Sequence, residues 1–170
     1  MQIEAATIIS IFALVISIIS TGFAVHSWRQ SNRPLITARI SINGGNVAAA
    51  LSIVVENTGN RPARNIRLSS RDEDVVRCLA PGRNQIIPEE IRNIFFSDIV
   101  IPVLANGRAV SNAFGLISHS SDSTWAPSFV LPITIHYEDI EGREFTSSLN
   151  LQSAYEDAFA GASWSTPTPI

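Results

Sequence analysis

An uncharged apolar stretch near the amino terminus constrains this chain most. It runs from Ala5 to Val25 and reads AATIISIFALVISIISTGFAV. An α-helix over these 21 residues would be about 31 Å long, close to the hydrocarbon thickness of a bilayer. A chain of 170 residues is too small to surround a helix that is apolar on every side. The stretch therefore predicts a transmembrane helix.

A cleaved signal peptide is the alternative for such a stretch. Signal peptides start with a basic region and end at a cleavage site formed by small residues. The four residues before the stretch, MQIE, include no Lys or Arg, and the FAVHS segment at its end is a poor cleavage site. We therefore interpret residues 1–28 as a retained anchor. Residues 29–34 form a short juxtamembrane link, because Pro34 disfavours continuation of the helix.

Basic residues near the stretch predict its orientation. Arg29, Arg33 and Arg39 follow it within about 15 residues, and no basic residue precedes it. The positive-inside rule then predicts an N-terminus outside the membrane and a cytoplasmic C-terminal domain; an extracytoplasmic domain is the alternative. Trp28 lies at the expected membrane boundary. We expect Arg29 and Arg33 to be contacts for lipid headgroups.

Small residues recur along one side of the predicted helix. Their spacing alternates between four and three residues, which keeps them on one face. Membrane helices associate through close backbone approach and hydroxyl hydrogen bonds. This face is a candidate association seam, for a second copy of the chain or another membrane protein, although Ala and Ser are also common in membrane helices. The seam consists of Ala6, Ser10, Ala13, Ser17, Ser20 and Ala24.

Charge and cysteine usage narrow the class of partner. The formal net charge is −3, which gives no electrostatic case for nucleic acid, so no nucleic-acid partner is predicted. Cys78 is the single cysteine, so an intramolecular disulfide is excluded. That usage agrees with a reducing compartment.

Residues 35–152 show the pattern of a small antiparallel β domain. Apolar and polar residues alternate in 35–42, 47–56 and 129–137, which indicates strands with one buried face. Asn43-Gly44-Gly45-Asn46 predicts a hairpin between the first two segments. About seven to nine short strands, with turn signals every 8–12 residues or so, favour a β-sandwich; a small barrel is the alternative.

Three segments are assigned from single residues rather than from alternation. Residues 74–79 are expected to form a short strand. Pro88, followed by two acidic residues, predicts the start of a helical turn. Residues 98–104 are expected to form a strand at a sheet edge or a bulge, because Pro102 cannot donate to a neighbouring strand.

Two further expectations concern burial and the tail. Residues 108–116 are predicted to form a strand, with Ala109, Ala113 and Leu116 as its candidate buried positions. Residues 153–170 are expected to form a partly disordered tail that starts with a short helix.

Two segments resemble a known sandwich family. Residues 51–66, LSIVVENTGNRPARNI, contain a strand, an Asn-x-Gly turn, a Pro-Ala step and another strand, and residues 135–145, IHYEDIEGREF, have the form of a terminal hairpin. Both resemble hairpins of immunoglobulin-like domains. The whole layout is similar to uncharacterised bacterial single-pass membrane proteins with one such domain. The resemblance implies an immunoglobulin-like β-sandwich at the bacterial inner membrane and implies no activity. The chain lacks the Cys-Trp-Cys core of true immunoglobulin domains.

Acidic and basic clusters are interpreted as surface. Carboxylates close to one bend can bind Ca²⁺, but no EF-hand spacing is present and hairpin turns favour Asp, so a solvated turn is preferred. A series of arginines after the Asn-x-Gly turn is interpreted as a solvated surface, with lipid headgroup contact as the alternative. The two sets are Glu138, Asp139, Glu141 and Glu144, and Arg61, Arg64, Arg67 and Arg71.

No residue carries a catalytic signature. His119 lies among serines, but the chain has no Gly-x-Ser-x-Gly motif. Cys78 follows an arginine, yet its apolar surroundings favour a buried thiol over a reactive one. Trp125 is interpreted either as an exposed contact for a protein partner or as a cover over the core. No catalytic residue, cofactor or metal is predicted, and the chain is not expected to be an enzyme.

These observations predict a membrane-anchored protein-interaction module. Its partners would be the lipid bilayer, a second copy or a membrane protein along the helix, and an unidentified protein bound to the β domain. The alternative is a structural or accessory subunit of a membrane-bound multiprotein assembly, in which the helix packs against a larger partner.

Overall fold

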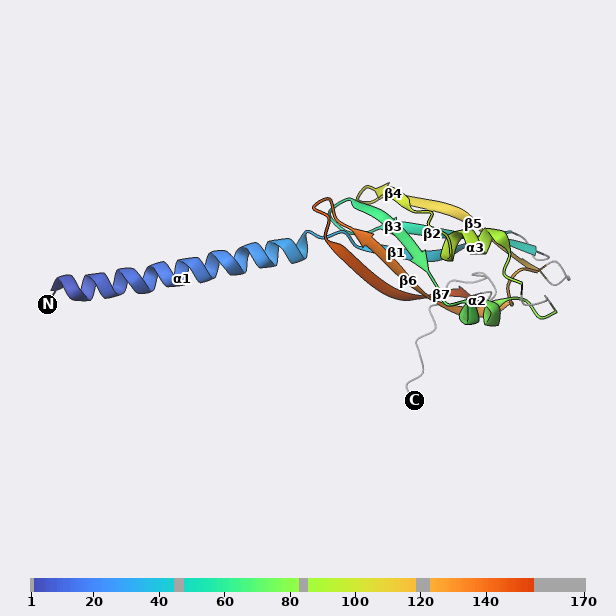
Figure 1. The fold of residues 1–170 in the computed structure, drawn as a ribbon, viewed down its shortest axis with the longest axis horizontal. Coiled ribbons are helices and arrows are strands. Elements are labelled where there is room, and N and C mark those ends of the chain that lie inside the picture. Colours follow the sequence, from blue (N-terminus) through green and yellow to red (C-terminus); the bar gives the residue numbers. More distant parts are fainter. Residues whose placement is uncertain (1, 45–47, 83–85, 119–122, 155–170) are drawn as a thin grey trace, which may run out of the picture.

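A long helix projects from one end of an elongated β domain in the computed structural model of the chain (Figure 1). The structure describes residues 2–44, 48–82, 86–118 and 123–154. Helix α1 spans Gln2–Ser31, and its described side chains, from residue 7 on, are exposed. Residues 7–31 form a helix long and apolar enough to cross a membrane, with none of it buried. The predicted apolar helix is therefore confirmed, as either a membrane anchor or a signal sequence.

The β domain consists of two antiparallel sheets packed as a sandwich. One sheet has three strands in the order β1-β2-β5, and the other has four in the order β4-β3-β6-β7. The predicted sandwich is confirmed over the barrel. The strands are β1 (Ile36–Gly44), β2 (Ala48–Asn57), β3 (Ala63–Ser69), β4 (Ile101–Leu104), β5 (Ala109–Ser118), β6 (Ser128–Glu138) and β7 (Glu144–Ala154).

The strongest sequence patterns correspond to the two hairpins. β1 pairs with β2 from Ile36 opposite Asn57 to Gly44 opposite Ala49, and β6 pairs with β7 along their whole length. Alternate residues of β6 are buried, as period two predicts. The buried residues of β6 are Phe129, Leu131, Ile133, Ile135 and Tyr137.

The strand predicted at residues 74–79 is wrong. The segment lies mostly in helix α2 (Asp72–Cys78), which has three acidic residues in its first turn. Acidic side chains stabilise the N-terminal end of a helix, and Val75 and Cys78, three residues apart, share its buried face. The helical start predicted at Pro88 is confirmed by helix α3 (Glu89–Phe95).

The burial predicted for β5 is also wrong. Ala109, Ala113 and Leu116 are exposed, whereas Phe114 and Ile117 are buried. The pairing of β2 with β5 shifts register at Leu51/Ser52, so alternation changes phase within the strand. The larger apolar side chains gain more from burial than alanine does, which favours this phase.

The end of the chain departs from the predicted boundary. β7 continues to Ala154, two residues beyond the expected domain end, so the start of the predicted tail helix is strand instead. The remainder of that tail, residues 155–170, lies outside the described residues.

Candidate functional site

The predicted seam residues are exposed along α1 as far as the structure describes them. Ser10, Ala13, Ser17, Ser20 and Ala24 all lie on the surface of the helix, and the side chain of Ala6 lies outside the described residues. The hydroxyl of Thr21 donates to the Ser17 carbonyl (2.9 Å). Association through this face stays a prediction.

Trp125 is a core residue, so an exposed partner contact at this position is wrong. Its side chain is 0% exposed. The indole ring stacks against both Phe114 and Phe129, with centroid distances of 4.6 and 4.7 Å. The indole N–H donates to the Phe114 carbonyl, which satisfies the one polar group of the ring. The other interpretation, a cover over the core, is confirmed.

The end of α1 is bonded directly to the sandwich. We call this region, residues 28–35 together with the turn 57–61, the junction. The N–H of Thr58 donates to the Leu35 carbonyl (2.9 Å) and the N–H of Asn60 to the Arg33 carbonyl (3.3 Å). The side-chain amide of Asn60 also reaches the Ser31 carbonyl at the helix end (3.2 Å). The link is therefore docked on the domain along its length.

Asn57 holds the junction together from inside. The residue is 0% exposed. Its amide group donates to the carbonyls of Arg61 (2.7 Å) and Leu104 (3.0 Å). Its side-chain oxygen accepts the N–H of Gly59 (3.0 Å) and of Leu35 (3.4 Å). One side chain thus joins the link, its own turn and the end of β4.

The backbone of the turn touches the backbone of the link. A Cβ on Gly59 would lie 2.3 Å from the nitrogen of Leu35 and 2.5 Å from the oxygen of Arg33, so only glycine fits there. Pro34 is buried, and its carbonyl accepts the hydroxyl of Tyr137 (3.5 Å).

Aromatic and charged side chains surround the junction. The guanidinium of Arg61 lies 5.0 Å from the ring centroid of Trp28, which is a cation–π contact. The same arginine pairs with Glu141 (2.5 Å). Arg29 and Arg33, the predicted headgroup contacts, are exposed on the same end of the molecule.

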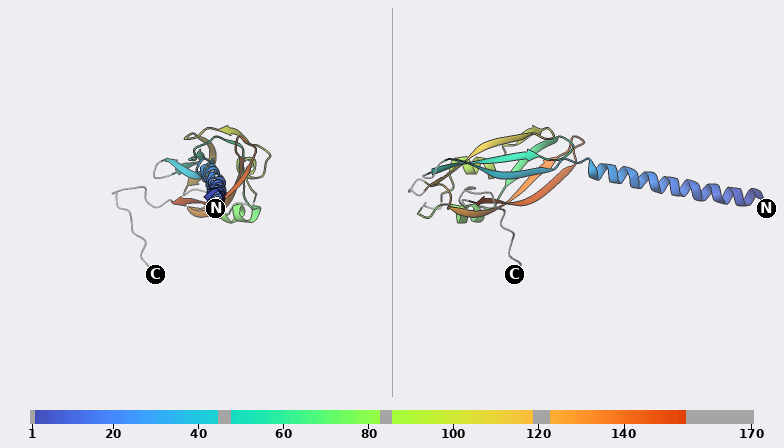
Figure 2. Two further views of the ribbon diagram at one scale, coloured as in Figure 1. Left: turned by 90° about the vertical axis from the view of Figure 1, so that its left-hand side faces the viewer. Right: turned by 180° about the vertical axis from the view of Figure 1, so that it is seen from behind.

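The turn between β6 and β7 lies beside the end of α1, where it is drawn in orange (Figures 1 and 2). The carboxylate of Asp139 is buried and accepts the N–H groups of Glu141 (2.8 Å) and Arg143 (2.9 Å). This carboxylate therefore stabilises the turn rather than facing solvent. Ile140 at the tip is 50% exposed.

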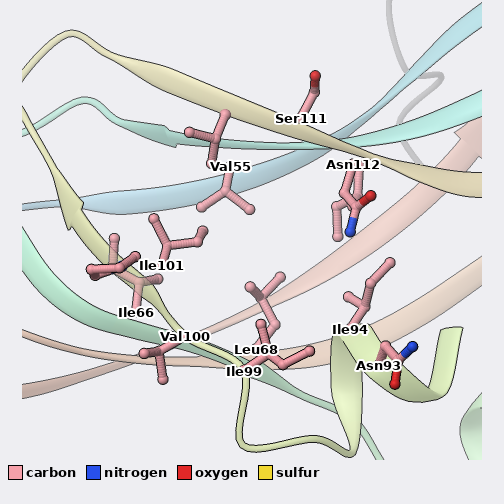
Figure 3. Close-up of a pocket in the computed structure, with 13 residues that line it drawn as sticks. Val55, Ile66, Leu68, Asn93, Ile94, Ile99, Val100, Ile101, Ser111 and Asn112 are labelled. Carbon is pink, nitrogen blue, oxygen red and sulfur yellow. The ribbon is translucent and has the colours of Figure 1, made fainter. Parts of the chain in front are cut away.

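An apolar cleft opens on one long side of the sandwich. It has a volume of about 340 Å³ and lies between the edge strands β4 and β5, with α3 at one end. Figure 3 shows side chains from both sheets facing each other across it. Ile53 and Val55 of β2 and Ile66 and Leu68 of β3 line its floor, while Ile101 and Val110 lie on the two edge strands. We call it the β4–β5 cleft.

No further strand pairs with the outer side of β4, or with that of β5 along the cleft, in the described part of the chain. Beyond the cleft, Leu116 and Ser118 of β5 are hydrogen-bonded to residues 123–125. β4 pairs only with β3 and β5 only with β2. Residues 109–113 of β5 are exposed on both faces. Polar side chains of Asn93, Ser111 and Asn112 stand at the rim, and Ile99 beside them is 67% exposed. Such a cleft between free edges has the features of a peptide-binding groove.

Two of the remaining titratable groups, Cys78 and His136, can be placed among the described residues. Burial raises the pKa of the Cys78 thiol, and its S–H donates to the Val130 carbonyl (3.5 Å), so the predicted buried thiol is confirmed. His136 is exposed on β6, and His119 lies outside the described residues. The described residues contain no group of three or more His, Cys, Asp or Glu that could hold a metal ion.

Sequence reasoning missed both the cleft and the role of Asn57. The cleft depends on which strands become sheet edges, and Pro102 was its only available signal, since proline is confined to edges. Asn57 was interpreted as a turn residue, and its donation across the domain to Leu104 has no local signature.

The chain matches a family model described as Domain of unknown function (DUF8453) over residues 3–155. The match covers α1, both sheets and the junction. A search of curated proteins finds no match.

Proposed function

Because the chain belongs to the DUF8453 family, whose model includes the apolar helix as well as the sandwich, we propose that it is a membrane-anchored protein-interaction module without catalytic activity. The observation that carries this proposal is the β4–β5 cleft, an apolar groove between two free strand edges on a domain fixed to the end of an exposed apolar helix.

The junction supports α1 as a retained anchor. A signal peptidase needs access to the chain just after the apolar segment. In this chain the carbonyls of Ser31, Arg33 and Leu35 are already hydrogen-bonded to the turn of the sandwich. Cleavage after the helix would also break the cation–π contact between Trp28 and Arg61. With Arg29 and Arg33 after the apolar stretch, the domain is cytoplasmic and the N-terminus lies outside the bacterial inner membrane.

We further propose that the sandwich is immunoglobulin-like. Its first, second and fifth strands form one sheet, and the fourth, third, sixth and seventh form the other. That order places consecutive strands in facing sheets at three points, β2–β3, β4–β5 and β5–β6, as Greek-key sandwiches do. A strand beside β5 would extend the three-stranded sheet, and this is the position that an extended partner segment would occupy.

Topology is tested with cysteine accessibility in cells. Gln152→Cys adds an exposed thiol at the far end of β7, and the unsubstituted chain, whose Cys78 is buried, gives the background. A membrane-impermeant maleimide should label the variant only after the cells are opened. Labelling of intact cells would place the domain outside instead.

Partner binding is tested with photo-crosslinking residues at the cleft. Crosslinkers at Ile99 and Asn112 should capture the same protein, and one at exposed Val130, on another face, should not. Ser111→Glu should remove the product. Products that are independent of position, or unchanged by Ser111→Glu, would refute the cleft as the binding surface.

Purification in mild detergent followed by mass spectrometry separates this module from the alternative, an accessory subunit of a larger assembly. A stoichiometric membrane protein that copurifies through α1 would favour the subunit. A homo-oligomer alone would favour the module.

A further inference from the structure

We infer that the helix end of the sandwich is a second binding surface, which rests on the anionic headgroups of the bilayer through Arg29, Arg33, Arg61 and the β6–β7 turn. The inference depends on the proposed retention of α1 as a membrane anchor. It adds that the domain itself contacts the lipid surface, in a fixed orientation, instead of moving freely on a tether.

The length of α1 sets the distance between the domain and the hydrocarbon region of the bilayer. The apolar stretch ends at Val25 and the helix at Ser31, so six residues extend about 9 Å beyond the hydrocarbon. The headgroup layer of each leaflet is about 5–7 Å thick. The helix therefore ends at the outer edge of the headgroups. Because the link is bonded to the sandwich along its length, the domain begins there as well.

Trp28 and Arg61 connect the interface to the domain. Trp28 lies three residues beyond Val25, about 4.5 Å along the helix, at the depth where indole rings are favoured. Arg61 belongs to the sandwich, yet its guanidinium lies 5.0 Å from the indole centroid. A residue of the domain is thus held at headgroup depth.

The β6–β7 turn supplies an apolar tip beside this contact. Ile140 is 50% exposed at a position where hairpins favour Gly, Asn or Asp. The buried carboxylate of Asp139 holds the turn in shape. Next to the helix end, this exposed isoleucine is positioned to contact the headgroup layer.

Charge on this end favours phosphate groups. Arg29, Arg33, Arg61 and Arg143 are opposed at the tip by Glu141, which already pairs with two of them (2.5 Å to Arg61, 3.7 Å to Arg143). Asp139 is occupied by backbone N–H groups. Glu138 and Glu144 pair at the ends of β6 and β7, one position behind the turn.

Depth-dependent fluorescence quenching on the full chain tests this surface. Ile140→Cys carries an environment-sensitive probe, and Val130→Cys, at the end of β6 far from the turn, is the matched control. The proteins are reconstituted in vesicles of phosphatidylcholine with phosphatidylglycerol, with a quencher attached to the lipid headgroups. We expect quenching and a blue-shifted emission for the probe at 140 only. Unsubstituted chain gives the background from Cys78.

Two outcomes distinguish failure of this inference from failure of the anchor. If the protein floats with the vesicles but the probes at 140 and 130 behave alike, the headgroup surface is refuted and the anchor stands. If the protein does not float, both fail.

Charge is tested separately. In anionic vesicles, Arg33→Gln and Arg143→Gln should each lower about fivefold the ratio of domains in contact with the headgroups to domains away from them. The effect should be smaller in phosphatidylcholine alone. In phosphatidylcholine vesicles, free phosphate added at the total concentration of the anionic lipid should not restore the blue shift. Equal quenching in both vesicle types would refute the role of the arginines.

Discussion

At the junction backbone and side-chain groups are hydrogen-bonded between the link and the turn, whereas along the β4–β5 cleft no further strand among the described residues pairs with the outer edges. The junction contains a buried Asn57 with four hydrogen bonds and a glycine that touches backbone. The cleft has exposed apolar side chains and free strand edges. Buried polar groups need partners within the fold, so the junction is under structural constraint. Free strand edges can pair with another chain, which is why we propose the cleft as the binding region.

The largest effect is expected from Asn57→Ala. The substitution leaves two carbonyls, of which that of Leu104 is buried, and two N–H groups without their side-chain partner, so we expect the free energy of unfolding to fall by about 4 kcal/mol. Thermal unfolding of the full chain in detergent measures it. Asn112→Ala, at the exposed rim of the cleft, is the matched control and should change little. Equal losses for both would remove the contrast between the regions.

Gly59→Val should be nearly as costly. The added side chain would meet the backbone of Arg33 and Leu35, which cannot move without breaking the junction, and we expect a loss of about 3 kcal/mol. Gly22→Ala, on α1 with nothing within 4 Å of its Cβ position, controls for glycine replacement itself. An unchanged melting temperature for Gly59→Val would mean that the link is not docked.

Thiol reactivity compares the closed core with the open cleft. Because burial raises the pKa of Cys78, its alkylation at pH 8 should be at least about tenfold slower than that of a thiol introduced by Val110→Cys at the cleft. The protonated thiol is favoured in the folded domain. Its contribution to stability is therefore complete below the ordinary thiol pKa of about 8.5 and is lost as pH rises through the raised pKa. Equal rates would show that the core opens readily.

The smallest effect is expected at the rim of the cleft. Ile99→Ser removes a side chain that is 67% exposed, so stability should change by no more than about 0.5 kcal/mol. Leu68→Ala, on the buried floor, should cost about 3 kcal/mol. If the rim variant costs as much as the floor variant, the cleft is part of the core and not a surface.

Local patterns predicted most of the architecture. Alternation located β1, β2 and β6, and the apolar stretch located α1, because both signals depend only on neighbouring residues. The pattern failed at residues 74–79, where a seven-residue helix is too short to show its period. It failed again in β5, where a register shift alters the phase.

The candidate sites were less accessible from sequence because they depend on contacts between distant segments. Arg29 and Arg33 could be placed near the end of α1 from their position alone. Trp125 could not be assigned, since a loop tryptophan fits an exposed contact and a core position equally well. The β4–β5 cleft required the strand order, and the order is decided by packing of the whole domain.

The hydrogen bonds at Asn60 and Thr58 also fix the rotation of the domain about the axis of α1. Each residue of a helix turns the chain by about 100°, so one residue inserted before the junction would swing the cleft a quarter-turn or more around the helix. Two copies that paired through the same face of α1 would share one twofold axis from lipid to sandwich. The direction in which the cleft faces, relative to the exposed faces of α1, is therefore set by the number of residues between the helix and the junction.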